Sequence, residues 1–286
     1  MKKVCIVTNF GKDTNMRVTN TLKGLLYEHG VAFDELGERT EGDDYRYIDK
    51  KKLSDDTDCI IVLGGDGTLI GVARDVYGLD IPLLGVNLGT LGYLTEVEVH
   101  NMKYAVEQLA GDRYTLERRM LLFGSVLYER DSEDLHDIAL NDIVIGRLGH
   151  PQLINIKLFV NGRKLHSYDA DGLIISTPTG STAYNLSAGG PIVEPTASLV
   201  VITPICSHEL GLRSIVLSAD DTIEAEIGPG RKTDIEEACV TFDGQNIVSL
   251  KTGDRIQIRK AEKYTNLVNL NDMSFLETLR RKMSRH

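Results

Sequence analysis

The chain lacks any uninterrupted apolar stretch near the roughly 20 residues that a membrane-spanning helix needs. The N-terminal lysines are followed by a short apolar run, residues 4–8, that could be mistaken for a secretion signal. The run is too short for the apolar core of such a signal and continues into polar residues. We therefore expect a first β-strand here, no membrane partner and a cytoplasmic location.

The cysteines form no C-x-x-C pair, so the sequence indicates neither a zinc site nor a disulfide framework. They are scattered along the chain, three in apolar, strand-like runs and Cys206 beside one. We expect buried, free thiols in a reducing compartment. The positions are Cys5, Cys59, Cys206 and Cys239.

The chain has fewer basic than acidic residues, and its formal net charge is −10 over 286 residues. Proteins that bind nucleic acid non-specifically neutralise its phosphates with Lys and Arg, so we expect no nucleic-acid partner. A small ligand rich in phosphate stays compatible, because backbone N–H groups, helix ends and bound cations hold it locally. The length suffices for one large domain or two ordinary ones.

The first part of the chain alternates buried strands with helices, which is typical of parallel strands in an α/β layer fold. Apolar runs predict strands, and apolar residues near helical spacing predict helices. The predicted strands are 4–8, 59–63 and 81–86, and the predicted helices are 14–29, 69–77 and 100–110.

From residue 112 the segments are short, alternating and separated by turn residues, which predicts a β-rich domain. Residues 154–160 and 163–168 flank Asn161-Gly162, a hairpin turn signal. A final helix is predicted at 275–283. We expect an α/β N-terminal domain with a Rossmann-like parallel sheet (1–111 and about 268–286) and an all-β sandwich domain (112–267).

The predicted buried strand 59–63 runs directly into the sequence GGDGT at residues 64–68. Turns at the carboxyl ends of parallel strands bind ligands in α/β sheets, and glycines let phosphate oxygens approach the backbone. Thr68 is a candidate cap for the helix that follows. There is no Lys-Ser/Thr pair of a Walker A loop, and the glycine spacing misses G-x-G-x-x-G by one residue.

Asp66 is the unusual member of this segment, because a carboxylate beside phosphates is repulsive unless it has a function. It can bind Mg²⁺ or accept a proton from an attacking hydroxyl. The alternative is a turn residue whose carboxylate accepts local N–H groups.

A second segment, residues 171–191, passes from a buried strand into a run of hydroxyls and glycines with one aromatic, Tyr184. Hydroxyls and exposed N–H groups suit ribose and phosphate oxygens, and the tyrosine can stack on a planar base. Composition alone also fits a Ser/Thr/Gly-rich surface loop.

The GGDGT sequence is similar to a motif shared by NAD kinases, 6-phosphofructokinases and diacylglycerol-type lipid kinases. Residues 171–191 resemble the glycine-rich region of NAD kinases specifically. Asn141-Asp142 resembles their Asn-Glu/Asp pair, residues 87–95 their Asn-x-Gly-x-Leu-Gly-Phe segment, and residues 243–245 their late Asp-Gly-Gln turn. By this resemblance, which spans nearly the whole chain, the sequence is identified as a member of the NAD kinase family.

The resemblance implies transfer of the terminal phosphoryl group of ATP to the 2′-hydroxyl of the adenosine ribose of NAD, giving NADP. It implies Mg²⁺ or another divalent cation carried with ATP and no fixed protein cage for a metal. It also implies homodimers or homotetramers, and NAD binding by the β-rich domain.

Residue roles follow position by position from the same resemblance. Asp66 is the expected catalytic residue. The phosphate-loop residues are Gly64, Gly65 and Thr68. The expected substrate-binding residues are Gly67, Asn141, Asp142, Asp169, Asp171, Thr182, Ala183, Tyr184, Asn185, Leu186, Ser187 and Gln245.

The sequence departs from the family pattern at several positions. Tyr93 replaces the usual Phe, Asp142 is one methylene shorter than the commoner Glu, and Asp169 stands where a basic or polar residue is usual. Residues 204–208 also depart from the usual Pro-His arrangement, so His208 receives no role. Phosphate-neutralising roles for Arg118, Arg119 and Arg213 stay open.

Two other functions remain as alternatives. A diacylglycerol-type lipid kinase shares the GGDGT turn but gives no reason for the hydroxyl-rich segment. A non-catalytic dinucleotide-binding regulator would bind NAD without forming a product. The sequence leaves open ATP against polyphosphate as donor, NAD against NADH as acceptor, the oligomer size and feedback regulation.

Overall fold

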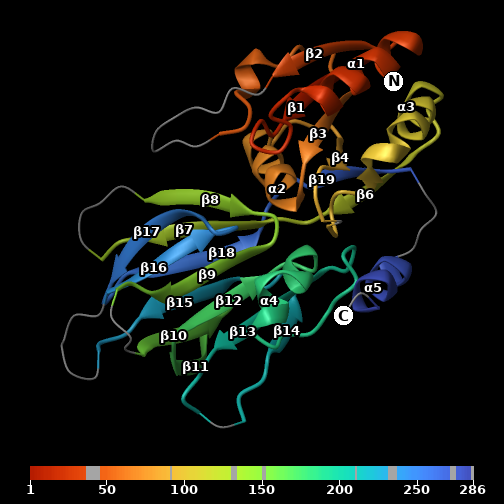
Figure 1. Ribbon diagram of the computed structural model, residues 1–286. Coiled ribbons are helices and arrows are strands. Elements are labelled where there is room, and N and C mark those ends of the chain that lie inside the picture. Colours follow the sequence, from red (N-terminus) through yellow and green to blue (C-terminus); the bar gives the residue numbers. More distant parts are fainter. Residues whose placement is uncertain are drawn as a thin grey trace. The chain divides into compact units, whose positions relative to one another are not determined.

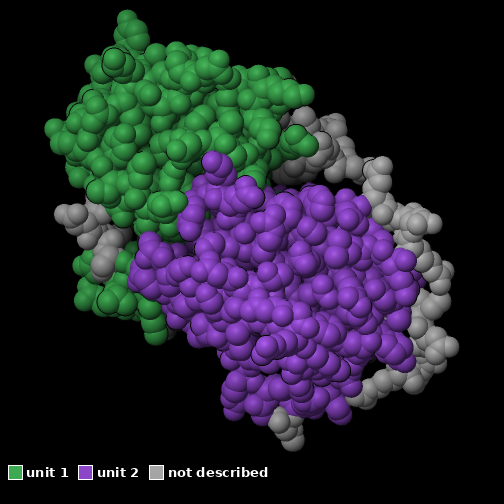
Figure 2. Space-filling model, turned by 180° about the vertical axis from the view of Figure 1, so that it is seen from behind, with its two compact units in different colours: residues 1–119, 265–286 green, residues 120–264 purple. Residues whose placement is uncertain are grey.

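The computed structural model describes residues 1–36, 46–90, 92–129, 134–149, 153–209, 211–230, 237–270 and 275–284. The chain divides into two compact units, one of residues 1–119 with 265–286 and one of residues 120–264 (Figure 2). They are called unit 1 and unit 2. The domain boundaries expected from the sequence stay a prediction.

Unit 1 is built on a mixed, mainly parallel sheet (Figure 1). Its strand order is β2-β1-β3-β4-β19-β6, with β5 paired to β4, and only β6 runs antiparallel to its neighbour. The strands are β1 (Lys3–Thr8), β2 (Ala32–Leu36), β3 (Cys59–Gly64), β4 (Leu83–Asn87), β5 (Val97–Glu98), β6 (Thr115–Arg119) and β19 (Thr265–Asn269).

The central strands β3 and β4 are buried along their whole length, as expected of a parallel sheet covered on both faces. Helices α1 (Arg17–Glu28) and α3 (Met102–Ala110) share one core cluster with one face of the sheet. Helix α2 (Asp66–Asp75) covers β4 at Gly85, where an added Cβ would lie 2.7 Å from Leu69. Two 3₁₀ turns are η1 (Lys50–Lys52) and η2 (Val99–Asn101), and the last helix is α5 (Phe275–Met283).

The order of the strands reverses between β1 and β3. The chain passes from β1 through α1 to β2 on one side of β1, and then continues to β3 on the other side. In open α/β sheets such a switch point leaves a crevice at the carboxyl ends of the two strands, where ligands bind. The ends concerned are Thr8 and Gly64.

The predicted helix starts are wrong by a few residues, for local reasons. Helix α1 begins at Arg17 instead of residue 14, because Met16 has φ 55°, outside the helical region. Helix α2 begins at Asp66 instead of residue 69, with Gly65 as the extended residue before it. Helix α3 begins at Met102, after the 3₁₀ turn η2.

Unit 2 contains two antiparallel sheets that share one hydrophobic core, so the expected fold class is confirmed in both units. The first sheet has the order β11-β10-β15-β18-β7-β8 and the second β14-β13-β12-β9-β16-β17. The strands of the first are β7 (Leu122–Leu127), β8 (Leu135–Ala139), β10 (Ile154–Val160), β11 (Arg163–Ala170), β15 (Ile223–Ile227) and β18 (Arg255–Lys260).

The second sheet carries the segments singled out for substrate binding. Its strands are β9 (Asp142–Arg147), β12 (Gly172–Ser176), β13 (Leu199–Ile205), β14 (Ile215–Ser218), β16 (Glu237–Phe242) and β17 (Gln245–Lys251). Between β12 and β13 lie η3 (Thr179–Thr182) and α4 (Tyr184–Ser187). The predicted hairpin at Asn161-Gly162 is confirmed, with φ 50° and 75° at its two turn residues.

The expectation of buried thiols holds for Cys5 and Cys59, and burial raises the pKa of both. It is wrong for Cys206, which is exposed in the turn after β13, and for Cys239, which is half-buried. Among the described residues, no helix has the length and apolar character to cross a membrane.

Asp13 anchors the loop between β1 and α1. Its carboxylate accepts hydrogen bonds from the backbone N–H groups of Val18 (3.2 Å) and Thr19 (2.9 Å) and from the Thr19 hydroxyl (2.7 Å). It is 5% exposed and satisfies N–H groups that the first turn of a helix leaves without an intrahelical partner.

We predict that Asp13→Ala lowers the free energy of unfolding by about 1–3 kcal/mol, the range for a lost helix cap and buried donors left unpaired. Urea unfolding followed by circular dichroism measures it. Asp55→Ala is the matched control, because Asp55 is exposed and makes the same charge change. Equal unfolding midpoints for the two variants would contradict the anchoring role.

Candidate active site

The GGDGT turn lies at the end of β3 and opens α2. Gly64 must be glycine, because an added Cβ would lie 2.6 Å from Cβ of Thr68. Thr68 does not cap the helix, contrary to our expectation; the helix cap position is Gly65, and Thr68 lies in the first turn. The Thr68 hydroxyl oxygen instead accepts a hydrogen bond from the amide of Asn9, 2.9 Å away, at the end of β1.

Asp66 accepts four hydrogen bonds from a loop that follows β4. Its Oδ2 accepts the backbone N–H of Tyr93 at 2.7 Å. Its Oδ1 accepts the N–H groups of Leu94 (3.2 Å) and Thr95 (3.1 Å) and the Thr95 hydroxyl (3.0 Å). The two oxygens are therefore unequal: among the described residues Oδ1 has three donors and Oδ2 has one.

This loop approaches Asp66 so closely that it needs a glycine. A Cβ added at Gly92 would lie 1.7 Å from Oδ1 of Asp66. The same loop also contacts the last helix: the Nζ of Lys282 in α5 lies 4.2 Å from the centre of the Tyr93 ring. Asp66 thus joins the loops at the ends of β3 and β4, a connection that spans almost thirty residues of sequence.

In unit 2, Asp243 holds the backbone of the Asn141-Asp142 segment. One carboxylate oxygen accepts the N–H groups of Asn141 (2.7 Å) and Asp142 (3.1 Å), and the other accepts that of Leu140 (2.8 Å). The Asp243 N–H in turn donates to the Asp142 carbonyl at 2.9 Å. The late Asp-Gly-Gln turn is therefore a structural partner of the pair, which the sequence did not reveal.

Asn141 and Asp142 each carry a buried polar group in an unfavourable environment. In the described part of the chain, Oδ1 of Asn141 is buried and has no hydrogen-bond donor. Asp142 is 5% exposed, and burial, reinforced by the charge of Asp243, raises the pKa of its carboxyl to about 7. A buried acceptor and a buried carboxyl group thus belong to consecutive residues at the start of β9.

The hydroxyl-rich segment folds onto the same end of β9. Across the strand pair, Ser176 lies opposite Asp142. The Thr177 hydroxyl donates to the Leu140 carbonyl at 2.6 Å and accepts the Gly180 N–H at 3.1 Å. A Cβ at Gly180 would lie 2.1 Å from the carbonyl oxygen of Asn141, so this residue must also be glycine.

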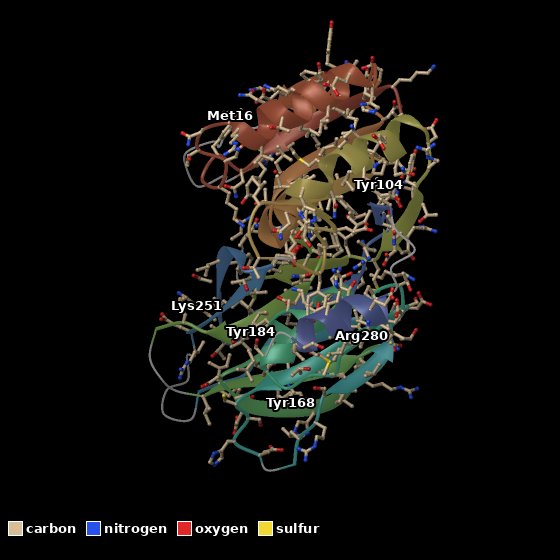
Figure 3. The ribbon with its side chains drawn as sticks, turned by 45° about the vertical axis from the view of Figure 1, so that its right-hand side comes forward. Met16, Tyr104, Tyr168, Tyr184, Lys251 and Arg280 are labelled. Atoms are coloured by element: carbon tan, nitrogen blue, oxygen red, sulfur yellow. The ribbon has the colours of Figure 1, made fainter. Side chains whose placement is uncertain are left out.

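The substrate-binding run 182–187 divides into buried and exposed members. Asn185 is fully buried, and its amide donates to the carbonyls of Ser181 and Pro191 while its oxygen accepts the Thr203 hydroxyl at 2.7 Å. Its contacts hold the segment together. Tyr184, in α4, is 46% exposed (Figure 3). Thr182 and Ala183 are half-buried, and Leu186 and Ser187 are exposed.

Asp169 and Asp171 lie at the other end of β12 from Asn141 and Asp142. Gly172 and Ser176 are four strand positions apart, or roughly 13 Å. Asp171 forms an ion pair with Arg147 (3.2 Å), and Asp169 accepts the amide of Asn155 (2.7 Å).

The other residues considered in the sequence analysis differ in exposure and in their contacts. Gly67 is exposed and Gln245, the first residue of β17, is half-buried. Arg119 is buried and its guanidinium lies 2.8 Å from Glu117, whereas Arg213 donates to the carbonyl of Leu212 at 3.1 Å. His208 donates its backbone N–H to the Asp169 carbonyl at 3.0 Å. Among the described residues, no group of three or more His, Cys, Asp and Glu side chains is arranged to hold a metal ion.

Comparison with known proteins identifies both parts of the chain. Residues 4–114 match the ATP-NAD kinase N-terminal domain, and residues 140–270 match the ATP-NAD kinase C-terminal domain. The chain is 46% identical to the NAD kinase of Lachnoclostridium phytofermentans over 284 residues, covering 99% of each chain. It is 44% identical to the NAD kinase of Agathobacter rectalis over 286 residues, covering 100% of each.

Solved structures agree with this result. The yeast NADH kinase complexed with NADH superposes with a TM-score of 0.83 at 25% identity, covering 98% of this chain and 86% of the yeast chain. An NAD kinase from Archaeoglobus fulgidus in complex with ATP has a TM-score of 0.76 at 24% identity, covering 99% of each chain. At this level of identity, the archaeal structure shows only that the two chains share a fold.

The raised pKa of Asp142 predicts a pH-dependent cost to stability. The unfolded carboxyl ionises near pH 4 and the folded one near pH 7, so its unfavourable effect grows as pH rises between these values. Asp142→Asn stays neutral at every pH. Its advantage in unfolding free energy over the wild type should widen by roughly 2–3 kcal/mol from pH 5 to pH 8.

Urea unfolding of both proteins at the two pH values measures this widening. Asp137→Asn, on a half-buried residue of β8, makes the same charge change as a control. A constant difference between wild type and Asp142→Asn from pH 5 to pH 8 would contradict the raised pKa.

Proposed function

The chain belongs to the NAD kinase family, and we propose that Asp66 is the proton acceptor for its reaction. The reaction transfers the terminal phosphoryl group of ATP to the 2′-hydroxyl of the adenosine ribose of NAD, giving NADP. The observation that supports the role of Asp66 is the unequal use of its carboxylate. Oδ1 is occupied by three donors, while Oδ2 has one and keeps an acceptor position for a hydroxyl.

The proposed phosphoryl transfer forms one bond, breaks one bond and releases one proton. The 2′-oxygen forms a bond to the γ-phosphorus of ATP, and the bond from that phosphorus to the β,γ-bridging oxygen breaks, so that ADP leaves. The proton of the 2′-hydroxyl passes to Oδ2 of Asp66 and then to solvent. The four hydrogen bonds fix the carboxylate in place, so that no reorganisation is needed when the proton moves.

A divalent cation, Mg²⁺ in our proposal, would arrive bound to ATP and neutralise part of the triphosphate charge. The donor set fits this arrangement. Asp66 is the carboxylate of the GGDGT turn, and with four hydrogen bonds it has room for at most one further contact on Oδ2. Nucleotide oxygens and water would supply the other ligands.

We assign recognition of NAD to unit 2. The Oδ1 of Asn141 is a buried acceptor without a donor among the described residues, a costly state that a bound hydroxyl or amide group would relieve. Asp142 beside it, with its raised pKa, can donate or accept near neutral pH. Exposed Tyr184 offers a face for a planar ring.

The remaining substrate-binding assignments rest on the family resemblance. These are Gly67, Asp169, Asp171, Thr182, Ala183, Asn185, Leu186, Ser187 and Gln245, with Gly64, Gly65 and Thr68 in the phosphate loop. We also propose a cytoplasmic location, which the four free cysteines support. A homodimer or homotetramer is proposed as well, and light scattering coupled to size exclusion would determine it.

One assay tests the function. The protein is incubated with Mg²⁺, NAD or NADH, and ATP or inorganic polyphosphate, and NADP(H) is detected with an NADP-specific dehydrogenase. We expect NADP from NAD and ATP. No product with any combination would overturn the proposal, and label transfer to lipid vesicles would favour the lipid kinase.

We predict that Asp66→Asn reduces kcat by at least about 100-fold, within the usual range for loss of a general base. The structure adds a complication, because the Asn amide would direct a donor at one of the backbone N–H groups of residues 93–95. Thr95→Val is the matched control. It removes one hydrogen bond to Oδ1 and leaves the carboxylate intact.

We expect kcat of Thr95→Val to stay within about tenfold of the wild type, since one hydrogen bond to a charged group contributes about 1.5–3 kcal/mol to stability and Oδ2 is untouched. Steady-state kinetics and urea unfolding of both variants make the comparison. A folded Asp66→Asn protein of near-normal kcat would contradict the role. An equal loss in Thr95→Val would mean that the loop, and not proton transfer, explains it.

A further inference from the structure

The ammonium group of Lys12 lies over the GGDGT turn. A Cβ added at Gly65 would be 2.7 Å from Nζ of Lys12, and one added at Gly89 would be 3.7 Å from it. The side chain therefore reaches from the loop after β1 across two glycines, one after β3 and one after β4. In sequence these residues are more than fifty positions from Lys12.

The loop that carries Lys12 is fixed on both sides. Its first residue, Asn9, donates its backbone N–H to the Leu63 carbonyl (2.9 Å) and its amide to the Thr68 hydroxyl (2.9 Å). The Lys12 N–H donates to the Asn9 carbonyl at 2.9 Å, and Asp13 caps α1. The position of the Lys12 backbone relative to the turn is thus set by hydrogen bonds.

The ammonium itself has no partner among the described residues. In the described part of the chain, no carboxylate lies within ion-pair distance of Lys12 and no oxygen accepts a hydrogen bond from its Nζ. The neighbouring Asp66, which would be the obvious counter-ion, is turned toward residues 93–95. The ammonium lies over two glycines, where no side chain shields the backbone N–H groups, near the point where the strand order reverses. An anion with several oxygens can bind such a combination of a cation and backbone.

We propose that Lys12 binds the phosphate oxygens of the triphosphate donor and stabilises the negative charge of the phosphoryl group during transfer. The proposal rests on the proposed function and adds a residue to it. The GGDGT segment has no lysine of its own, unlike a Walker A loop, and the fold supplies one from the loop after the neighbouring strand β1. Positive charge at this position acts on the donor phosphates.

Three variants test the proposal. Lys12→Met removes the charge and keeps the length of the side chain, and Lys12→Arg keeps the charge. Lys103→Met is the matched control, because Lys103 is an exposed lysine of α3 in the same unit and forms no ion pair with the described residues. Both positions, Lys12 and Lys103, are exposed, so folding should be preserved; circular dichroism and urea unfolding check it.

Steady-state kinetics are measured with ATP and NAD varied separately. We expect Lys12→Met to lower kcat/KM for ATP by about 10- to 100-fold, the usual size of a lost charged hydrogen bond. KM for NAD should stay within about twofold, and Lys12→Arg should recover to within about fivefold of the wild type. Lys103→Met should match the wild type.

A second readout does not depend on turnover. Inorganic tripolyphosphate carries the phosphates of the donor without adenosine, and its binding in the presence of Mg²⁺ and absence of NAD is measured by calorimetry. Lys12→Met should weaken it about tenfold or more, and Lys103→Met should not. This measurement tests Lys12 even if the wild type forms no NADP, so failure of the function and failure of this proposal are distinguishable.

Three results would overturn the proposal. Kinetic constants of Lys12→Met within twofold of the wild type would show that the ammonium is only solvated. An equal loss in Lys103→Met would indicate a general effect of charge. A rise in KM for NAD, with unchanged binding of ATP and tripolyphosphate, would assign the ammonium to the acceptor's pyrophosphate instead of the donor.

Discussion

The carboxylate of Asp66 is the constraint on which the first unit's site depends. It receives four hydrogen bonds from residues 93–95, and Gly92 is without a Cβ because Asp66 occupies that space. A carboxylate that only terminated a turn would accept donors close in sequence. Here the donors come from the end of the next strand, so that one side chain aligns the loops after β3 and β4. The proposed catalytic role and the observed architectural role therefore fall on the same residue, which is why a variant of Asp66 needs a control on the loop.

In the second unit, too, one aspartate fixes a loop by accepting several backbone N–H groups. Asp243 accepts three backbone N–H groups of residues 140–142. The segment it holds carries two costly groups, the buried Oδ1 of Asn141 and the buried carboxyl of Asp142. In both units an aspartate accepts backbone N–H groups and so fixes the polar groups that we propose for ligand binding. Preorganisation of this kind means that the polar groups of the site are ordered before the substrate arrives.

Much of this was predictable from short-range patterns. Buried strands, the Asn161-Gly162 hairpin and the chemical importance of Asp66 follow from adjacent residues and from the family resemblance. The partners were not predictable, because Asp66 and Thr95, or Asn141 and Asp243, meet only through strand order. The internal contacts of Asn185 were not predictable either: the residue stands in the run expected to bind substrate, and its amide is buried and hydrogen-bonded within the protein. Lys12 carried no sequence signal, since its target glycines lie on other strands.

The return of the chain to the first sheet has a consequence for the order of folding. Strand β19 lies between β4 and β6, and Thr265 pairs directly with Arg119, so the whole of unit 2 is inserted between two neighbouring strands. As the chain emerges from the ribosome, β4 pairs with β3 and β5 but has no β19 beside it until residues 265–269 are made. Unit 2, continuous in sequence, is complete by then. The segment synthesised first is thus the last to finish its sheet, and its open strand edge must be protected from other chains during that interval.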